Sequence, residues 1–195
     1  MKEDSDYYRA VEQTLTLADF ERGKHSPNHS LFHLERMRLL CTRLGNPQSD
    51  IPSVHIAGTK GKGTTSAMIT AILDSSGYKV GLVTSPHLHS LTERIRIGSE
   101  PISKNDFTNL VKQIWPLVME TGQNSQYGEV TWFEFMVSAA FHFFGESNVD
   151  FQVVETGLGG RLDATNILLP IVSVITSISL DHVNILGDTL AKIAS

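Results

Sequence analysis

VHIAGTKGKGTTS, residues 54–66, is the stretch that decides the fold of this chain. A short apolar run leads into a loop with three glycines and two lysines, and hydroxyl residues then open a helical pattern. This order of strand, glycine loop and helix is typical of a phosphate-binding loop, because glycines let backbone amides approach an anion and the helix N-terminus adds partial positive charge. Lys62 would reach the outer phosphates of a nucleotide, and a hydroxyl of Thr64 or Thr65 would face a bound magnesium ion.

The stretch departs from the usual phosphate-loop pattern, G-x-x-x-x-G-K-[ST]. Ile56 stands where that pattern has its first glycine, and Gly63 stands where it has a serine or threonine. The alternative is a glycine-rich connection that binds no ligand. We favour the phosphate loop because three glycines carry a backbone entropy cost that a plain turn does not require.

Composition is that of a soluble globular protein. The 195 residues are 41% hydrophobic and 19% charged, and their formal net charge of −5 argues against general nucleic-acid binding. The single cysteine, Cys41, cannot form an internal disulfide, and its neighbours Leu39 and Leu40 indicate a buried, inert thiol. The sequence shows no signal, transit segment or membrane-length apolar run, so we expect a cytoplasmic protein with no membrane partner.

Strand and helix patterns alternate along the chain, which predicts an α/β fold with a mostly parallel sheet flanked by helices. We expect strands over residues 54–57, 79–84, 149–155 and 171–178. The last of these is an uninterrupted β-branched run, which is typical of a strand buried on both faces. We expect residues 1–50 to form a helical and substrate-loop segment packed on a main ATP-binding domain, residues 51–195.

Helix-capping residues and helix-breaking glycines and prolines indicate where the helices begin and end. We expect helices over residues 30–44, from the glycine loop to about 76, over 103–120 and over 131–145, and an unfinished helix that Asp188 caps. Pro116 is expected to bend or shorten its helix, ahead of a polar loop at 122–128. The arginines of the first helix are most simply its solvated face: Arg36, Arg38 and Arg43.

Polar or glycine-rich residues follow four predicted strands, at 58–64, 85–87, 155–161 and 179–182. Because the carboxyl ends of parallel strands meet at one edge, we expect these segments to converge around a ligand. Ser85, Glu155 and His182 offer a hydroxyl, a carboxylate and an imidazole, and oxygen-rich donors suit Mg²⁺ that bridges nucleotide phosphates, although histidine is less typical. Each has an ordinary structural alternative as a turn residue, a salt-bridge partner or a capping histidine; their convergence favours the site.

Other polar residues carry two interpretations each. Thr131 and Glu134 form a capping box, which needs no function. Arg161 and Asp163 would form a local ion pair or hold an anionic substrate. Arg94 and Arg96 are either ordinary strand charges or, less simply, partners for a substrate carboxylate, and Lys60 adds positive charge for a polyphosphate.

These motifs together resemble folylpolyglutamate synthase and dihydrofolate synthase, the folate branch of the Mur ligase family. The matching stretches occur in family order over about residues 25–195: GTKGKGTT (58–65), TSPHL (84–88), TERIRI (92–97), TWFE (131–134), ETGLGGRLDATN (155–166) and LDHVNILGDTLAKI (180–193). The resemblance implies the P-loop central domain of such a ligase.

The resemblance also implies an activity. ATP, with Mg²⁺, would phosphorylate a carboxylate of a folate, of dihydropteroate or of both, and the amine of L-glutamate would displace phosphate from the acyl phosphate. The small molecules would be the only partners of a monomeric protein. Carried over to this sequence, the nucleotide-binding residues are Gly58, Thr59, Lys60, Gly61, Lys62, Gly63, Thr64 and Thr65. The metal ligands are Ser85, Glu155 and His182, the catalytic residues are Lys62, Glu155 and His182, and the pteroate or folate pocket includes Thr131, Trp132, Phe133, Glu134, Arg161 and Asp163.

Two departures from the family pattern matter. Family members are more than twice as long, and their C-terminal Rossmann-like domain, which binds glutamate, is missing here, as is the E-K-A-G-I segment with its carbamylated lysine. We therefore expect a truncated chain that is inactive alone. FHLER at 32–36 replaces the L-G-L-E-R of some bifunctional members, so the substrate preference stays open. The competing hypotheses are a non-catalytic nucleotide-binding regulatory module and a P-loop kinase or GTPase, the latter disfavoured because no N-K-x-D motif is present.

Overall fold

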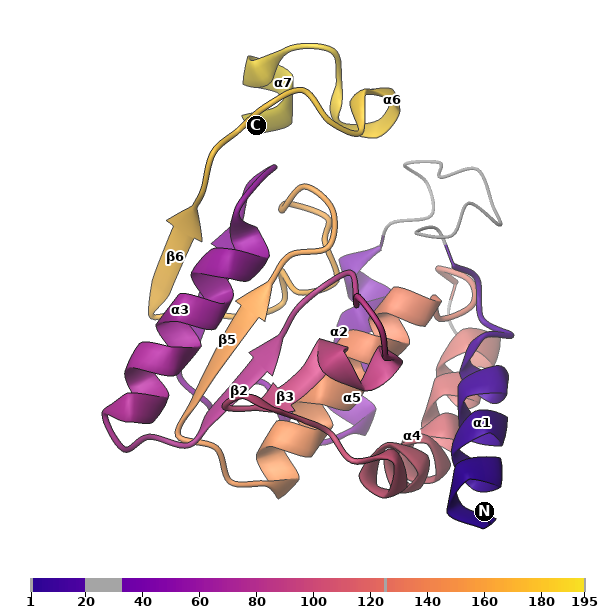
Figure 1. Cartoon of the computed structure of the whole chain (residues 1–195). Coiled ribbons are helices and arrows are strands. Elements are labelled where there is room, and N and C mark those ends of the chain that lie inside the picture. Colours follow the sequence, from indigo (N-terminus) through magenta and orange to yellow (C-terminus); the bar gives the residue numbers. More distant parts are fainter. Residues whose placement is uncertain (1, 20–32, 125, 195) are drawn as a thin grey trace.

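The computed structural model describes residues 2–19, 33–124 and 126–194. Within them one sheet has six strands in the order β4-β3-β2-β5-β1-β6 (Figure 1). The strands are β1 (Ser53–Ala57), β2 (Val80–Val83), β3 (Ile95–Ile97), β4 (Glu100–Pro101), β5 (Phe151–Glu155) and β6 (Val172–Ile175). Strands β2, β5, β1 and β6 are parallel, and β3 and β4 add an antiparallel edge, which confirms the predicted α/β class.

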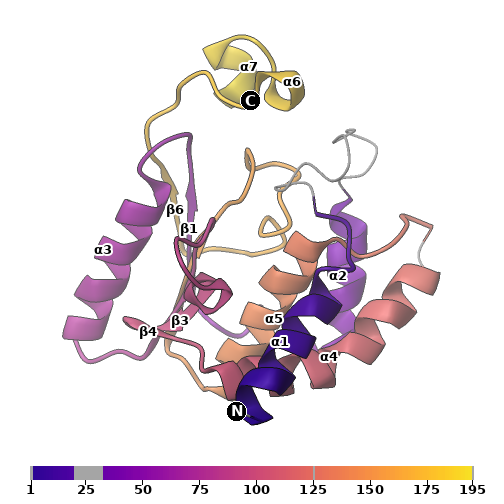
Figure 2. The same ribbon diagram turned by 45° about the vertical axis from the view of Figure 1, so that its right-hand side comes forward.

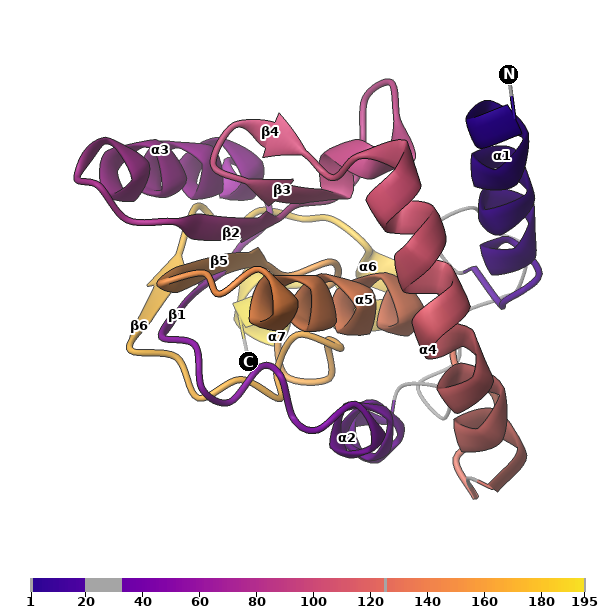
Figure 3. The same ribbon diagram turned by 90° about the horizontal axis from the view of Figure 1, so that it is seen from below.

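Helices cover both faces of the sheet. Seen from below in Figure 3, α3 (Lys62–Ser75) lies on one face and α5 (Trp132–Glu146) on the other. The remaining long helices lie on the α5 side: α1 (Lys2–Thr14), α2 (Leu34–Arg43) and α4 (Lys104–Asn124). Figure 2 shows the short α6 (Val183–Leu186) and α7 (Leu190–Ala194) beyond the carboxyl ends of the parallel strands. None of the described helices combines the length and apolar character needed to cross a bilayer.

The core has two parts because successive strand residues face opposite sides of the sheet. On β5, Val153 packs in the smaller cluster with Ile69 and Leu73 of α3. Its neighbour Val154 belongs to the larger cluster, which α1, α2, α4 and α5 share. Cys41 is buried in that larger cluster, and burial raises the pKa of its thiol to about 12, as expected for an inert cysteine.

Several predicted boundaries were wrong. Helix α4 continues through Pro116 to Asn124, so the proline does not shorten it and the expected polar loop begins later. Ile114 and Val118, on either side of the proline, are fully buried, and this packing holds the helix across the one missing N–H. Helix α2 begins at Leu34, and the predicted cap at Ser30 lies outside the described residues.

The expectation that residues 171–178 form a strand buried on both faces was also wrong. Strand β6 pairs only with β1 among the described strands, and Val172 and Ile175 are 48% and 72% exposed. A β-branched run predicts a strand, but it does not determine whether the two faces of that strand are buried, because burial depends on other elements that pack against them. At the C-terminal end Thr189, rather than Asp188, caps the last helix, since its Oγ1 accepts the Lys192 N–H at 3.2 Å.

Gly81 on β2 provides a test of the sheet-to-helix packing. A Cβ at this position would lie 2.7 Å from the ring of Phe144, which is fully buried and has no room to move. We expect Gly81→Ala to lower the free energy of unfolding by about 1–3 kcal/mol because the core is overpacked. Urea denaturation followed by circular dichroism measures this change.

The matched control is Gly145→Ala in α5, where a Cβ would meet only Pro47 Cβ at 3.5 Å. That variant should be neutral or more stable by up to about 1 kcal/mol, because alanine restricts the unfolded chain. Wild-type stability for Gly81→Ala would contradict the packing described here.

Candidate functional site

The loop between β1 and α3 requires glycine at two positions. Gly58 has φ 137°, and a Cβ there would lie 2.0 Å from Thr176 Oγ1. Gly61 has φ 84° and precedes the first residue of α3, Lys62. The predicted sequence of strand, glycine loop and helix is therefore present, and the free amides of the first turn of α3 point toward the loop.

Backbone and side-chain hydrogen bonds of Thr59 tie the loop to the segment after β6. The Thr59 N–H donates to the Ser177 carbonyl at 2.9 Å, and Thr59 Oγ1 accepts the Ser179 N–H at 3.1 Å. Lys62 folds back over the loop, and its Nζ donates to the Gly58 carbonyl at 3.0 Å. This bond holds the ammonium group beside the loop amides, where an anion would be received.

Glu155 and Ser85 meet at the ends of β5 and β2. The Ser85 N–H donates to Glu155 Oε2 at 3.1 Å, and a Cβ on Gly63 would lie 3.4 Å from the same oxygen. Burial raises the pKa of Glu155 above its ordinary value, while the Ser85 N–H and the charges of Lys62 and Arg94 oppose the rise. The carboxylate thus lies against the N-terminal turn of α3.

A hydroxyl and a carboxylate in this position fit a hard cation such as Mg²⁺, which takes oxygen donors and keeps several waters. His182, the third predicted ligand, is the residue before α6, has φ 47°, and lies 3.9 Å through Nε2 from Asp181 Oδ1. No hydrogen bond or ion pair within the described part of the chain joins His182 to Ser85 or Glu155. The part of the chain that the structure describes contains no cluster of three or more His, Cys, Asp or Glu side chains placed to hold a metal. The three-residue ligand set stays a prediction.

A second glycine-rich loop, residues 156–161, follows β5 and is organised by Asp163. The Asp163 carboxylate accepts the N–H groups of Gly157 and Leu158 through Oδ2, at 2.9 Å and 2.8 Å. Burial raises the pKa of Asp163, opposed by the hydrogen bonds that it accepts. Arg161 is exposed, and the described contacts include no ion pair between Arg161 and Asp163, so the structure does not support that alternative.

The N-terminus of α5 carries the predicted capping box. Thr131 Oγ1 accepts the Glu134 N–H at 3.2 Å, and Glu134 Oε2 accepts the Thr131 N–H at 2.8 Å. Phe133 packs over the second glycine loop, where a Cβ on Gly157 would lie 2.5 Å from its ring. Trp132 is fully buried and faces the core, so the structure does not bring this predicted pocket residue to a ligand surface.

Two arginines of the predicted elements, Arg94 and Arg36, are buried. Arg94 is 4% exposed; its Nε donates to His87 Nδ1 at 2.9 Å and its guanidinium lies 4.6 Å from the Trp132 ring centroid. Arg36, expected on a solvated face, is 3% exposed and pairs with Glu134, with Nε at 2.8 Å from Oε2 and 3.1 Å from Oε1. Arg36 Nη1 also donates to the Tyr127 carbonyl at 2.5 Å. Arg36 therefore joins α2 to the start of α5.

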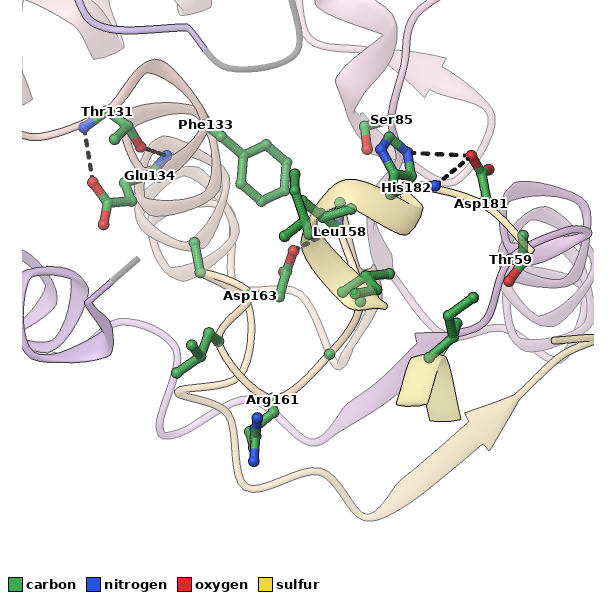
Figure 4. Close-up of a pocket in the computed structure, with 18 of the residues that line it drawn as sticks. Thr59, Ser85, Thr131, Phe133, Glu134, Leu158, Arg161, Asp163, Asp181 and His182 are labelled. Atoms are coloured by element: carbon green, nitrogen blue, oxygen red, sulfur yellow. Dashed lines mark hydrogen bonds and ion pairs between the residues drawn. The ribbon is translucent and has the colours of Figure 1, made fainter. Parts of the chain in front are cut away.

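These elements surround one cleft of about 800 Å³, shown in close-up in Figure 4. From the loop and strand ends it receives Thr59, Lys62, Ser85 and His182. From the opposite walls it receives Thr131, Phe133, Glu134, Arg161 and Asp163. Gly58 lines a smaller adjoining cavity of about 190 Å³, and the other predicted site residues do not line the cleft: Lys60, Gly61, Gly63, Thr64, Thr65, Trp132 and Glu155. Arg36 and His33 also line the cleft but were not predicted to belong to the site.

Comparison with known proteins assigns this arrangement to a family. A scan against protein-family models found no match. Among curated proteins, the Bacillus subtilis dihydrofolate synthase/folylpolyglutamate synthase is 48% identical over 162 residues, which is 83% of this chain and 37% of that protein. The human mitochondrial folylpolyglutamate synthase is 39% identical over 97% of this chain and 34% of its own length. The chain is homologous to the folylpolyglutamate and dihydrofolate synthases.

Solved structures agree with this homology. A Mycobacterium tuberculosis folylpolyglutamate synthase complexed with ADP matches with a TM-score of 0.87 and 38% identity, over 98% of this chain and 41% of that one. A folylpolyglutamate synthase complex with AMPPCP and folate matches with a TM-score of 0.86 and 34% identity, over 96% and 44%. The predicted family and fold are confirmed, and the chain spans well under half the length of these synthases.

The Arg36–Glu134 ion pair makes a quantitative prediction. Arg36→Met would leave a buried carboxylate without its cation, so we expect the free energy of unfolding to fall by about 3–5 kcal/mol. The double variant Arg36→Met/Glu134→Met should regain much of that loss, because apolar side chains of similar volume replace a buried pair well. Urea denaturation of the three proteins measures both effects.

Arg38→Met is the matched control, because Arg38 pairs with Glu35 at 4.0 Å on the exposed side of the same helix. Its effect should stay within about 1 kcal/mol. A loss for Arg36→Met no larger than that of Arg38→Met would refute the structural importance of the buried pair.

Proposed function

We propose that this chain is the ATP-binding part of an ATP-dependent ligase that adds L-glutamate to a folate, to dihydropteroate, or to both. The observation that supports it is the cleft of about 800 Å³, in which Thr59 and Lys62 of the phosphate loop face the N-terminus of α5 and the second glycine loop. Two homologous synthases have been solved with ADP and with AMPPCP plus folate. Because the chain spans only 37% of the Bacillus subtilis relative, the activity belongs to the whole protein of which this part would be the nucleotide side.

In the proposed reaction an oxygen of the substrate carboxylate attacks the γ-phosphorus of ATP, and the bond to the ADP oxygen breaks. The amine of L-glutamate then attacks the acyl carbon of the acyl phosphate, phosphate leaves with the bonding pair, and the amine loses a proton. A carboxylate is a poor electrophile, so phosphorylation supplies the leaving group. The protein mainly positions the reactants and stabilises charge that develops in transfer.

Residues in and beside the cleft have distinct roles in this proposal. The amides at the start of α3 and the ammonium of Lys62 would hold the β- and γ-phosphates and offset the charge of the transferred group. Ser85 and Glu155, with His182, would hold Mg²⁺, which neutralises phosphate charge when bound. Thr131, Phe133 and Glu134, together with Arg161 and Asp163, would line the pterin side. A monomeric state and a cytoplasmic location are further parts of the proposal.

Nucleotide binding tests the first half of the proposal. We expect calorimetry to detect weak binding of Mg·AMPPCP by the chain, and Lys62→Ala to weaken it about tenfold or more, because a charge-assisted contact to phosphate is lost. Lys112→Ala on the exposed side of α4 is the matched control and should bind as the wild type does. Absence of binding to the wild-type chain at millimolar nucleotide would contradict the proposal.

Phosphate release tests the second half. The chain is joined to the part of the Bacillus subtilis synthase that lies beyond the matched region, and ATP hydrolysis is assayed with L-glutamate and either dihydropteroate or tetrahydrofolate. Release that requires glutamate and one of the two pterins confirms a ligase and names its substrate. Nucleotide binding without turnover favours the non-catalytic nucleotide-binding module instead, and release that is independent of glutamate and of both pterins contradicts the ligase.

A further inference from the structure

Three side chains connect strand β1, next to the edge strand β6, to the second glycine loop. His55 on β1 places Nε2 at 2.7 Å from Thr165 Oγ1, and Thr165 Oγ1 lies 2.5 Å from Asp163 Oδ1. Thr165 is fully buried and Asp163 is 4% exposed. His55 and Thr165 have no other role in the cleft, yet the half-buried His55 and the buried Thr165 link β1 to the cleft wall.

The hydrogen bonds along this path run in one direction. Asp163 accepts the Gly157, Leu158 and Thr165 N–H groups and the Thr165 hydroxyl, so every neighbour is a donor and the group acts as a carboxylate. The Thr165 hydroxyl therefore gives its only proton to Asp163 and accepts from His55. This order assigns the imidazole proton to Nε2, and burial, which lowers the pKa of His55, favours the neutral ring.

We propose that His55 and Thr165 are positioning residues that fix the Asp163 carboxylate and, through it, the backbone of the second glycine loop. The two oxygens of Asp163 accept different hydrogen bonds. Oδ2 accepts the N–H groups of Gly157 and Leu158, and Oδ1 accepts the hydroxyl of Thr165. With the hydroxyl removed, the carboxylate keeps the loop amides but loses a partner that fixes its rotation. Low local dielectric and the ionised acceptor strengthen such a chain of bonds.

This inference rests on the proposed function for its consequence, because the positioned loop is one wall of the proposed ligand cleft. Gly157 and Leu158 both line that cleft, and the Phe133 ring packs directly on Gly157. A loop that drifts from the sheet would therefore move the wall between the phosphate loop and the pterin side.

Amide hydrogen exchange of the ligand-free chain tests the positioning directly. In Thr165→Val, we expect the Gly157 and Leu158 amides to exchange about tenfold faster than in the wild type, the change expected for losing one buried charge-assisted hydrogen bond. The amides of Val153 and Val154 in β5 should be unchanged. Thr165→Ser keeps the hydroxyl and should restore slow exchange. Thr108→Val is the matched control, since Thr108 is also buried but donates to the Lys104 carbonyl within α4, on another element.

A second pair of variants acts from the other end of the path. His55→Leu removes the donor to Thr165, whereas His55→Gln retains an N–H that can serve it. We expect faster exchange at Gly157 and Leu158 for leucine and near wild-type exchange for glutamine. This pair decides the question on its own if Thr165→Val does not fold.

Titrations with Mg·AMPPCP and with folate measure the consequence. Thr165→Val should weaken folate binding several-fold, and Thr165→Ser should restore it. Unchanged exchange at Gly157 and Leu158 in Thr165→Val and His55→Leu, or an equal rise in β5, would overturn the positioning role. A wild-type chain that binds neither ligand would instead contradict the proposed function, while the exchange data would still decide the role of His55 and Thr165.

Discussion

The close approach of Gly58 to Thr176 is the constraint on which the rest of the structure depends. Strand β1 is paired on both sides, with β5 and β6, so its end cannot shift to relieve a clash. A Cβ at Gly58 would lie 2.0 Å from Thr176 Oγ1, and only glycine lets the chain turn there into α3. That turn fixes the direction of the α3 N-terminus, and thereby aims its amides at the same edge where Ser85 and Glu155 lie.

Buried carboxylates dominate the chemistry of that edge, and each is stabilised differently. Glu134 is paired with the Arg36 guanidinium, Asp163 is surrounded by N–H and O–H donors, and Glu155 receives one backbone N–H near Lys62. Burial raises the pKa of both Glu155 and Asp163. The acceptors of Glu134 and Asp163 are largely used within the protein, whereas Glu155 has capacity left for a cation. This difference fits the proposed role of Glu155 as a metal ligand, whereas Glu134 and Asp163 hold the backbone of the cleft walls in place.

Local patterns predicted the strand and glycine loop at 54–66 and the capping box of Thr131 and Glu134, because spacing within a few residues determines them. Burial that depends on a distant partner was not predicted. Arg36 lies one helical turn before the buried Leu40, so its position on the apolar face was visible, but its partner Glu134 is 98 residues away. Likewise, β-branched residues after Pro170 indicated β6 without showing what covers it. The role of His55 needed three side chains from separate segments to be seen together.

The two edge strands of the sheet differ in their ability to pair with a further strand. Strand β4 has two residues, and Pro101 has no N–H to offer a further strand. At the other margin β6 is extended, pairs only with β1 among the described strands, and exposes Ile175. Such a margin is a template for added strands, from the same chain or from another copy. Self-association of the chain in solution should therefore begin at the β6 edge of the sheet. Repulsion between chains of net charge −5 opposes this association.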